Sequence, residues 1–253
     1  MSSHSNQPLR GHTALITGGA RRLGAAIARL LHASGANVLV HYHRSGTAAT
    51  TFVDELNSIR PGSAASHCAN LLEVATLPRI INAAVDTFGR LDVLVNNAST
   101  FYPTRLGEIT LEAWDDLMGS NLRAPLFLAQ AAAPELSKRQ GLILNIVDIH
   151  GLRPLKAHAV YCAAKAGLVM LTYSLARELG PSVRVNAIAP GPVMWPETPM
   201  SPEMKASIVD RTALKRVGTP QDVAKAALYF AADAPFVTGQ VLAIDGGRST
   251  NGF

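Results

Sequence analysis

Short apolar runs alternate with longer alanine-rich segments along the whole chain, and this alternation restricts the fold more than any other feature. The runs at 13–17, 92–95 and 142–147 are rich in Val, Ile and Leu, as strands buried on both faces are. The alanine-rich segments between them, such as 25–33, carry apolar residues at helical spacing. Strands that alternate with helices in this way predict an α/β fold with a parallel sheet covered on both faces.

Composition favours one domain. The chain has 253 residues, of which 48% are hydrophobic, which is enough for one large core. No stretch rich in Pro, Gly and Ser and no block of charge divides it into two parts. We therefore expect a flexible N-terminal tail at residues 1–10 and one domain at residues 11–253.

Several partners and compartments are disfavoured by composition. The two cysteines, Cys68 and Cys162, are too few for a disulfide framework and have no metal-ligand spacing. The polar start of the chain does not resemble a signal peptide, and no stretch approaches the roughly 18 apolar residues of a membrane span. A cytoplasmic protein without a membrane segment or a bound metal is expected. The net charge of +5 comes from scattered Lys and Arg residues, which suits an anionic small molecule better than nucleic acid.

A strand, a glycine-rich turn and a helix follow one another at residues 13–33. Gly18 lets the backbone turn, and Gly24 lets the helix pack closely against the strand. The N-terminus of such a helix offers free N–H groups to a pyrophosphate. Arg22 stands where a third glycine is common, so its guanidinium could contact cofactor phosphate or a flat polar substrate. A plain tight turn is the alternative interpretation.

The second predicted strand, residues 37–42, indicates the choice of cofactor. Enzymes that use NAD usually place Asp or Glu at the end of this strand to bind the ribose hydroxyls. Here His43, Arg44 and Ser45 follow instead. Arg44 can pair with a 2′-phosphate and Ser45 can hydrogen-bond to it, which favours NADPH over NADH. A solvated basic turn is the alternative.

The later strands are also followed by polar residues. The third, at 63–69, ends at Asn70, which could meet an adenine edge or cap the next helix. The fourth runs into Asn97-Ala98-Ser99, small and amide residues where open α/β sheets bind ligands. Phe101 follows and could stack on a flat ring or simply pack against a loop. Residues 111–134 read as a helix in which Asn121 marks a kink or binds water.

Tyr161 and Lys165 are four residues apart near the start of a predicted helix at 157–179. Residues at this spacing share one helix face. A nearby ammonium favours the phenolate, so we expect Lys165 to lower the pKa of Tyr161 and to make it a proton donor suited to neutral pH.

These pieces together resemble the short-chain dehydrogenase/reductase family, over nearly the whole chain from Thr13 to Gly247. The resemblance rests on Thr17-Gly18 through Gly24, Asn96-Asn97-Ala98, Asn121, Tyr161 with Lys165, Asn186 with Pro190-Gly191, and Asp245-Gly246-Gly247. It implies a single doubly wound Rossmann-type domain with a seven-stranded parallel sheet flanked by helices, and a homotetramer. It also implies a mobile substrate loop at about 192–210, a water held by Asn121 in a proton relay, and a Pro190-Gly191 turn against the nicotinamide. The residues expected to bind NADPH are Gly18, Arg22, Leu23, His43, Arg44, Ser45, Asn70, Leu71, Asn97, Ala98, Ser99, Tyr161, Lys165, Pro190 and Gly191.

Asp148 departs from the general family pattern. Most members carry a serine thirteen residues before the tyrosine, and an ionised carboxylate cannot donate a hydrogen bond to a carbonyl as that serine does. A carboxylate suits a substrate with N–H groups or a ring nitrogen that must be protonated.

The departures resemble one subgroup, the pteridine reductases and the related dihydromonapterin reductases. The shared pieces are Arg22-Leu23-Gly24, His41-Tyr42-His43-Arg44-Ser45, Asn97-Ala98-Ser99 with Phe101-Tyr102-Pro103, and Asp148; the segment at 192–202 matches poorly. The resemblance implies a pterin or folate held by Arg22, Ser99, Phe101, Asp148 and Tyr161, with Asp148, Tyr161, Lys165 and Asn121 as catalytic residues.

Three hypotheses follow. The first is an NADPH-dependent reductase that takes a dihydropterin or dihydrofolate to the tetrahydro form. The second is a carbonyl or 3-oxoacyl thioester reductase, against which Asp148 and Phe101 argue. The third is an inactive NADPH-binding regulator, against which the intact Asn121, Tyr161 and Lys165 set argues.

Overall fold

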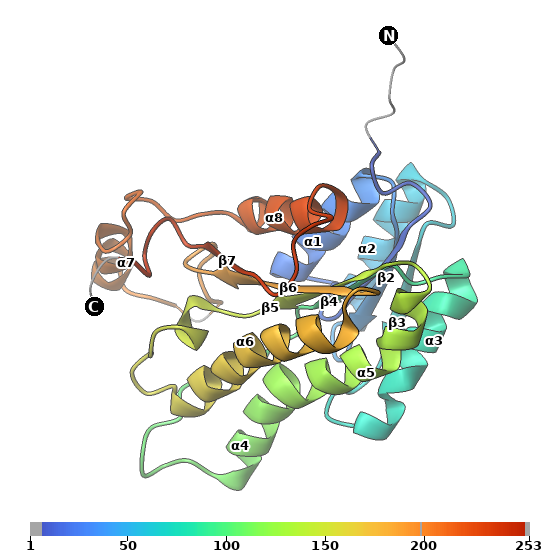
Figure 1. Ribbon diagram of the computed structural model, residues 1–253. Helices are drawn as coiled ribbons and strands as arrows, with labels where there is room; N and C mark the ends of the chain where they lie inside the picture. Colours follow the sequence, from blue (N-terminus) through green and yellow to red (C-terminus); the bar gives the residue numbers. More distant parts are fainter. Residues whose placement is uncertain (1–6, 198, 251–253) are drawn as a thin grey trace.

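A seven-stranded parallel sheet forms the centre of the computed structural model, which describes residues 7–197 and 199–250 (Figure 1). The strands lie in the order β3-β2-β1-β4-β5-β6-β7, and every neighbouring pair is parallel. Their bounds are β1 (Thr13–Ile16), β2 (Asn37–Tyr42), β3 (Ala64–Cys68), β4 (Val93–Asn96), β5 (Leu142–Ile146), β6 (Arg184–Pro190) and β7 (Val241–Ile244). The predicted doubly wound Rossmann-type sheet is confirmed.

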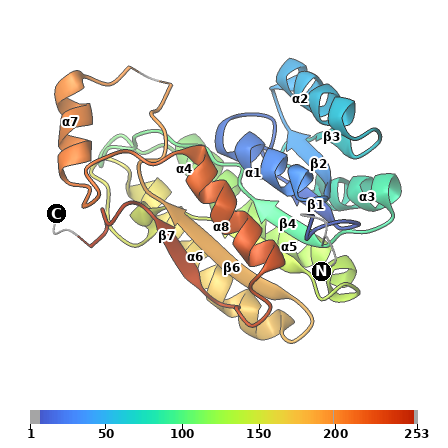
Figure 2. The same cartoon turned by 90° about the horizontal axis from the view of Figure 1, so that it is seen from above.

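Helices cover both faces of the sheet (Figure 1). One face carries α1 (Arg22–Ala33), α2 (Gly46–Ile59) and α8 (Pro220–Ala232); the other carries α3 (Leu77–Phe88), α4 (Leu111–Met118), α5 (Ala124–Ser137) and α6 (Ala159–Leu179). The short helix α7 (Pro202–Asp210) stands away from the sheet (Figure 2). Two cores result, because successive strand residues point to opposite faces: Ala14 and Ile16 pack with α1, whereas Leu15 packs with α3.

Parallel strands bring their carboxyl ends to one edge of the sheet. The chain leaves β1 toward one side and β4 toward the other, and such a reversal opens a crevice in which doubly wound proteins bind ligands. The segments that follow β1, β2, β4, β5 and β6 therefore meet at this edge, and they contain most of the predicted site residues.

Several element boundaries differ from the predictions. Helix α1 begins at Arg22 rather than Ala25, and Arg22 itself has a left-handed φ of 52°, which explains why glycine is common there. Helix α6 begins at Ala159 rather than Ala157, because Ala157 has a φ of 62°. The third strand is shorter than predicted.

The predicted helix at 111–134 is interrupted. Residues Gly119–Arg123 form a single π-helical turn between α4 and α5, and Asn121 lies in it. Such turns add one residue to a helix and are often found at functional sites. The helix is thus irregular at Asn121, and the binding of water by Asn121 stays a prediction.

The predicted boundaries of the domain also need correction. Leu9 is buried, and its N–H donates to the carbonyl of Ser34, so residues 7–10 belong to the domain rather than to a loose tail. Residues 1–6 lie outside the described residues. The predicted substrate loop at 192–210 is helical in its last part, where α7 forms, and its residue 198 is outside the described residues, as are residues 251–253.

Helix α6 corrects the expectation that no segment is apolar enough to cross a membrane. With 21 residues and a mean hydropathy of 1.4, it is long and apolar enough to cross a membrane. Half of its apolar window is buried inside the protein, and α6 packs against β6. Burial of this kind is typical of a helix in a domain core.

Candidate active site

The loop after β1 is tied to the loop after β4 by side-chain hydrogen bonds. Thr17 Oγ1 accepts the N–H groups of Asn97 (2.9 Å) and Ala98 (3.0 Å). In return, Asn97 Nδ2 donates to the carbonyls of Thr17 (2.8 Å) and Gly18 (3.2 Å). Asn97 therefore has a structural role besides its predicted cofactor contact, and Thr17 is a positioning residue to which the sequence analysis assigned no role.

The glycine-rich turn packs tightly against the start of α1 because Gly24 has no side chain. A Cβ on Gly24 would lie 2.3 Å from the carbonyl oxygen of Gly18. Among the described residues, no side chain caps the N-terminus of α1. A close-packed turn that leads into an uncapped helix N-terminus fits a pyrophosphate.

The loop after β2 has the predicted basic residues on its surface. His43 and Arg44 are exposed, and Ser45 precedes the first turn of α2. No side chain of the described residues caps this helix either. A second uncapped N-terminus beside Arg44 fits a 2′-phosphate. Asn70 bonds locally, since its Oδ1 accepts the N–H of Leu72 (3.1 Å); its contact with adenine remains a prediction, as does that of the buried Leu71.

Tyr161 and Asp148 are in direct contact. The phenol of Tyr161 donates to Oδ2 of Asp148 at 2.8 Å. Oδ1 of the same carboxylate accepts the N–H of His150 at 2.8 Å, which holds Asp148 at the start of the short 3₁₀ turn Ile149–Gly151. The sequence placed both residues in the site but did not show that they are hydrogen-bonded.

The predicted fall in the pKa of Tyr161 is wrong for the protein without ligands. Burial and then the negative charge of Asp148 raise the pKa of Tyr161, and the nearby Ser99 side chain opposes them weakly. Lys165 Nζ lies 5.7 Å from the centre of the Tyr161 ring and donates to the carbonyl of Ile146 at 2.9 Å. Burial lowers the pKa of Lys165 to about 8. Tyr161 is therefore fully protonated at neutral pH, the form that a proton donor requires.

Asn121 and Ser99 form a second polar pair beside Tyr161. Ser99 Oγ donates to Oδ1 of Asn121 at 2.7 Å, and Asn121 Nδ2 donates to the carbonyls of Thr100 (3.0 Å) and Leu117 (2.9 Å). The side chain of Asn121 is thus fully used in joining the π turn to the loop after β4. Its role in a proton relay stays a prediction.

Phe101 lies in an aromatic cluster at the site. Its ring stacks on His158, with centroids 4.7 Å apart and planes 13° apart, and meets Tyr161 edge-on at 4.8 Å. About half of Phe101 remains exposed. The contact with His158 matches the alternative that Phe101 packs against a neighbouring loop. Stacking of Phe101 on a flat substrate stays a prediction. His158 was missed because a loop histidine gives no signal of its own in the sequence.

Arg22 points toward the segment after β6. Its Nη2 donates to the carbonyl of Trp195 at 3.0 Å, and Nη1 lies 3.4 Å from Glu197. Arg21 also pairs with Glu197, at 2.5 Å. The structure therefore places Arg22 between the phosphate loop, which includes Leu23, and the predicted substrate loop, without showing contact with Phe101 or Asp148.

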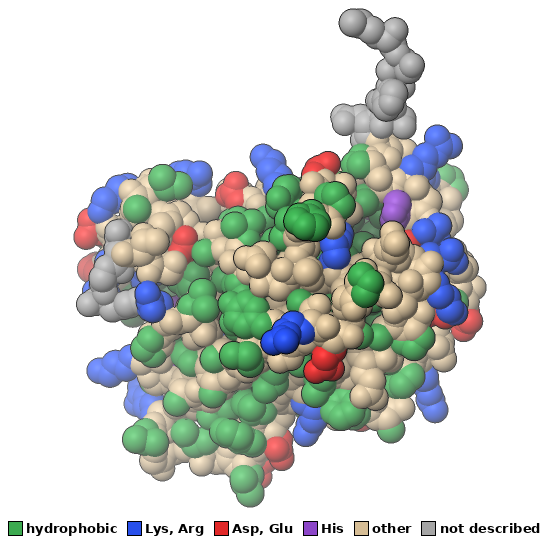
Figure 3. All heavy atoms as spheres, viewed as in Figure 1, with side chains coloured by type: hydrophobic (Ala, Val, Ile, Leu, Met, Phe, Trp, Pro, Cys, Tyr) green, Lys and Arg blue, Asp and Glu red, His purple; other side chains and the backbone are tan. Residues whose placement is uncertain are grey.

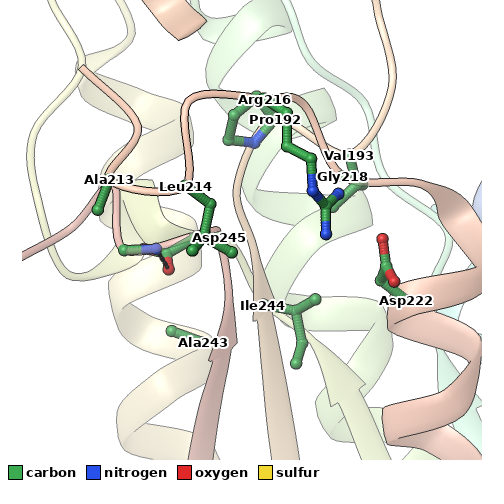
Figure 4. Close-up of a pocket in the computed structure, with 12 residues that line it drawn as sticks. Pro192, Val193, Ala213, Leu214, Arg216, Gly218, Asp222, Ala243, Ile244 and Asp245 are labelled. Atoms are coloured by element: carbon green, nitrogen blue, oxygen red, sulfur yellow. Dashed lines mark hydrogen bonds between the residues drawn. The ribbon is translucent and has the colours of Figure 1, made fainter. Parts of the chain in front are cut away.

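A cavity of about 530 Å³ lies beside the Pro190-Gly191 turn. Pro192 and Val193, which follow that turn, line the cavity, as do Arg216 and Asp222 (Figure 4). A Cβ on Gly191 would lie 2.6 Å from that of Asp245, so glycine is needed where the end of β6 approaches the end of β7. In the part of the chain that the structure describes, no group of three or more His, Cys, Asp or Glu side chains could hold a metal ion.

Comparisons with known proteins agree with this geometry. A family model described as enoyl-(acyl carrier protein) reductase matches residues 18–249. The 3-oxoacyl-[acyl-carrier-protein] reductase FabG of Staphylococcus aureus is 36% identical, over 93% of this chain and 97% of that protein. Pteridine reductase 1 of Leishmania tarentolae is 35% identical, over 93% and 96%. A blue fluorescent protein from a metagenomic library, solved in complex with NADPH, superposes with a TM-score of 0.90 at 34% identity, over 96% of this chain and 99% of its own.

Proposed function

Because the chain belongs to the short-chain dehydrogenase/reductase family, we propose that it catalyses the NADPH-dependent reduction of a pterin. The substrate would be a dihydropterin or dihydrofolate, reduced to the tetrahydro form. The observation that carries the proposal is the hydrogen bond between Tyr161 and Asp148, because a carboxylate at this point favours a substrate with N–H groups.

The residues of the site fit NADPH. The two uncapped helix N-termini lie where a pyrophosphate and a 2′-phosphate would bind, and Arg44 stands beside the second. The solved structure with a TM-score of 0.90 contains NADPH. Bound NADPH would supply a hydride to the carbon of a C=N bond and would itself become NADP⁺.

Tyr161 would give its proton to the ring nitrogen of the same bond, so that C=N becomes CH–NH. Its pKa is raised by burial and by Asp148, so the proton is present at neutral pH. After transfer, the phenolate would be stabilised by the ammonium of Lys165 and could be reprotonated through Asp148. Asp148 has lone pairs besides those used by Tyr161 and His150, and these could accept N–H groups of the substrate.

Phe101 would form one wall for the flat ring. Aromatic rings stack favourably on a flat heterocycle, and Phe101 is held beside Tyr161 by His158. Arg22 and Ser99 would bind polar atoms at the ring edge, as the resemblance implies.

Reduction of a 3-oxoacyl thioester is the second candidate, and a specific observation favours it. Relatives named 3-oxoacyl-[acyl-carrier-protein] reductase are as similar to this chain as the pteridine reductase is, at 36–37% against 35%. Overall identity therefore does not separate the two activities, and Asp148 and Phe101 become the deciding residues.

One assay panel tests the proposal. NADPH oxidation is followed with dihydrobiopterin, dihydromonapterin, dihydrofolate and an acetoacetyl thioester. We expect turnover with at least one dihydropterin and little turnover with the thioester. The opposite ranking would replace the first candidate with the second.

We also propose that the protein is a homotetramer. Large apolar side chains are exposed on the outer helices, including Leu111 and Trp114 on α4 and Met170 and Tyr173 on α6. Hydrophobic side chains gather over this region of the surface (Figure 3), and exposed patches of this kind often mark interfaces. Light scattering coupled to size-exclusion chromatography measures the assembly, and a monomer would contradict the proposal.

A further inference from the structure

His41, a buried residue of β2, connects two segments that the cofactor is expected to contact. Its Nδ1 accepts the N–H of Gly18 in the phosphate loop at 3.3 Å. Its Nε2 bonds with the carbonyl of Ala69, the residue before Asn70, at 3.1 Å. Because β2 lies between β1 and β3, a single ring spans from the turn after β1 to the end of β3.

The two partners fix the chemical form of the imidazole. A backbone N–H can only donate, so Nδ1 must keep its lone pair; a backbone carbonyl can only accept, so Nε2 must carry the proton. Protonation of Nδ1 would set two donors against each other. His41 is 2% exposed. Burial lowers its pKa to about 4; the hydrogen bond to Ala69 opposes this shift, and the nearby His67 on β3 and His43, just after β2, add to the lowering. The neutral form with the proton on Nε2 is therefore kept at physiological pH.

We propose that His41 is a positioning residue for NADPH, which acts on the cofactor through Gly18 and Ala69. Its ring would hold the phosphate loop and the adenine end of the site in one arrangement before the cofactor arrives. The backbone of His41 supports the same loop, since its carbonyl accepts the N–H of Gly19 at 3.1 Å. The inference rests on the proposed use of NADPH, but not on the identity of the substrate.

His32 offers a matched control. It is also buried, with 3% exposed, and its Nε2 lies 2.6 Å from Ser63 Oγ. Burial lowers its pKa to about 4 as well. It stands near the end of α1 that is far from the phosphate loop, so its loss should affect stability without affecting the cofactor.

The experiment measures the Kd of NADPH by calorimetry, and the Tm, for the wild type, His41→Leu, His41→Gln and His32→Leu. His41→Leu removes the partner of the Gly18 N–H and of the Ala69 carbonyl. We expect this loss to weaken NADPH binding by about tenfold. His41→Gln can accept and donate and should recover part of the affinity. His32→Leu should lower the Tm and leave the Kd unchanged. The ¹⁵N spectrum of the wild-type histidines should show His41 neutral, with its proton on Nε2, at pH 6.

The outcomes separate this inference from the proposed function. A wild type that binds no NADPH would overturn both. A wild type that binds NADPH, with a His41→Leu Kd that is unchanged or raised no more than in His32→Leu, would overturn this inference alone. If His41→Leu does not fold, an unchanged Kd in His41→Gln together with a charged or Nδ1-protonated His41 in the wild-type spectrum would overturn it.

Discussion

The hydroxyl of Tyr161 donates a 2.8 Å hydrogen bond to the carboxylate of Asp148, thirteen residues earlier in the chain. The contact joins the end of β5 to the first turn of α6 and gives the phenol a strong acceptor. It also makes Tyr161, the proposed proton donor, electrostatically different from a tyrosine beside a serine hydroxyl, since burial and the negative charge of Asp148 raise the pKa of the phenol.

Replacement of Asp148 by serine tests the role of this contact. We expect Asp148→Ser to lower kcat with a dihydropterin by about tenfold or more, because an acceptor for substrate N–H groups and a route for reprotonation are lost. Turnover of an acetoacetyl thioester should rise relative to the pterin. Asp148→Asn, which keeps the size but removes the charge, is the control for packing. Wild-type kcat in the serine variant would remove Asp148 from the mechanism.

Phe101 can be tested through the type of substrate. Phe101→Ala should raise the KM of a dihydropterin several-fold to about tenfold, because a stacking partner is removed. The KM of the thioester should change little, and Phe101→Tyr should behave as the wild type does. Steady-state kinetics with both substrates make the comparison; an equal rise for both would show that the ring only supports the loop.

Arg44 should decide between the two nicotinamide cofactors. We expect Arg44→Asp to shift the ratio of kcat/KM values for NADPH and NADH by about tenfold or more toward NADH, since a carboxylate repels a 2′-phosphate and can bind ribose hydroxyls. Arg139→Asp makes the same change in net charge at an exposed position after α5. A preference that moves equally in both variants would point to net charge rather than to a specific contact.

The buried Lys165 predicts a dependence of stability on pH. Burial lowers its pKa from 10.5 to about 8 in the folded protein, whereas the unfolded chain keeps the proton to about pH 10.5. Between these values the unfolded state holds more protons, so the free energy of unfolding should rise with pH. The shift corresponds to roughly 3 kcal/mol.

Lys165→Met isolates this effect. Urea unfolding at pH 7 and at pH 10 gives the free energy for both proteins, and other alkaline groups cancel in the difference. We expect the wild type to gain stability relative to Lys165→Met as the pH rises. Parallel curves would mean that Lys165 keeps its ordinary pKa in the folded state.

Much of the fold could be predicted because its causes are local. Apolar runs of strand length gave the strands, and Gly18 and Gly24 marked the turn after β1. Tyr161 and Lys165 could be placed on one face by helical spacing alone. Asn121 could be expected to disturb its helix, because an amide there competes for backbone groups.

The rest depended on contacts between distant segments. The direction of the pKa shift of Tyr161 was predicted wrongly. The sequence shows only the neighbouring cation, Lys165, whereas the two dominant causes, burial and the contact with Asp148, arise only in the folded chain. Three contacts join residues far apart in the sequence: the hydrogen bond from Arg22 to Trp195, the one from Gly18 to His41, and the stacking of His158 on Phe101. No periodicity in the sequence reports such contacts.

The π turn at Gly119–Arg123 makes the chain sensitive to length at this point. Each residue of an α-helix advances the chain by about 100° around the axis, so one deletion here would turn α4 by about that angle relative to α5. Asn121 would swing away from Ser99, and the loop after β4 would lose its anchor. Substitutions on the exposed face of this segment should be tolerated, but changes in the number of its residues should not.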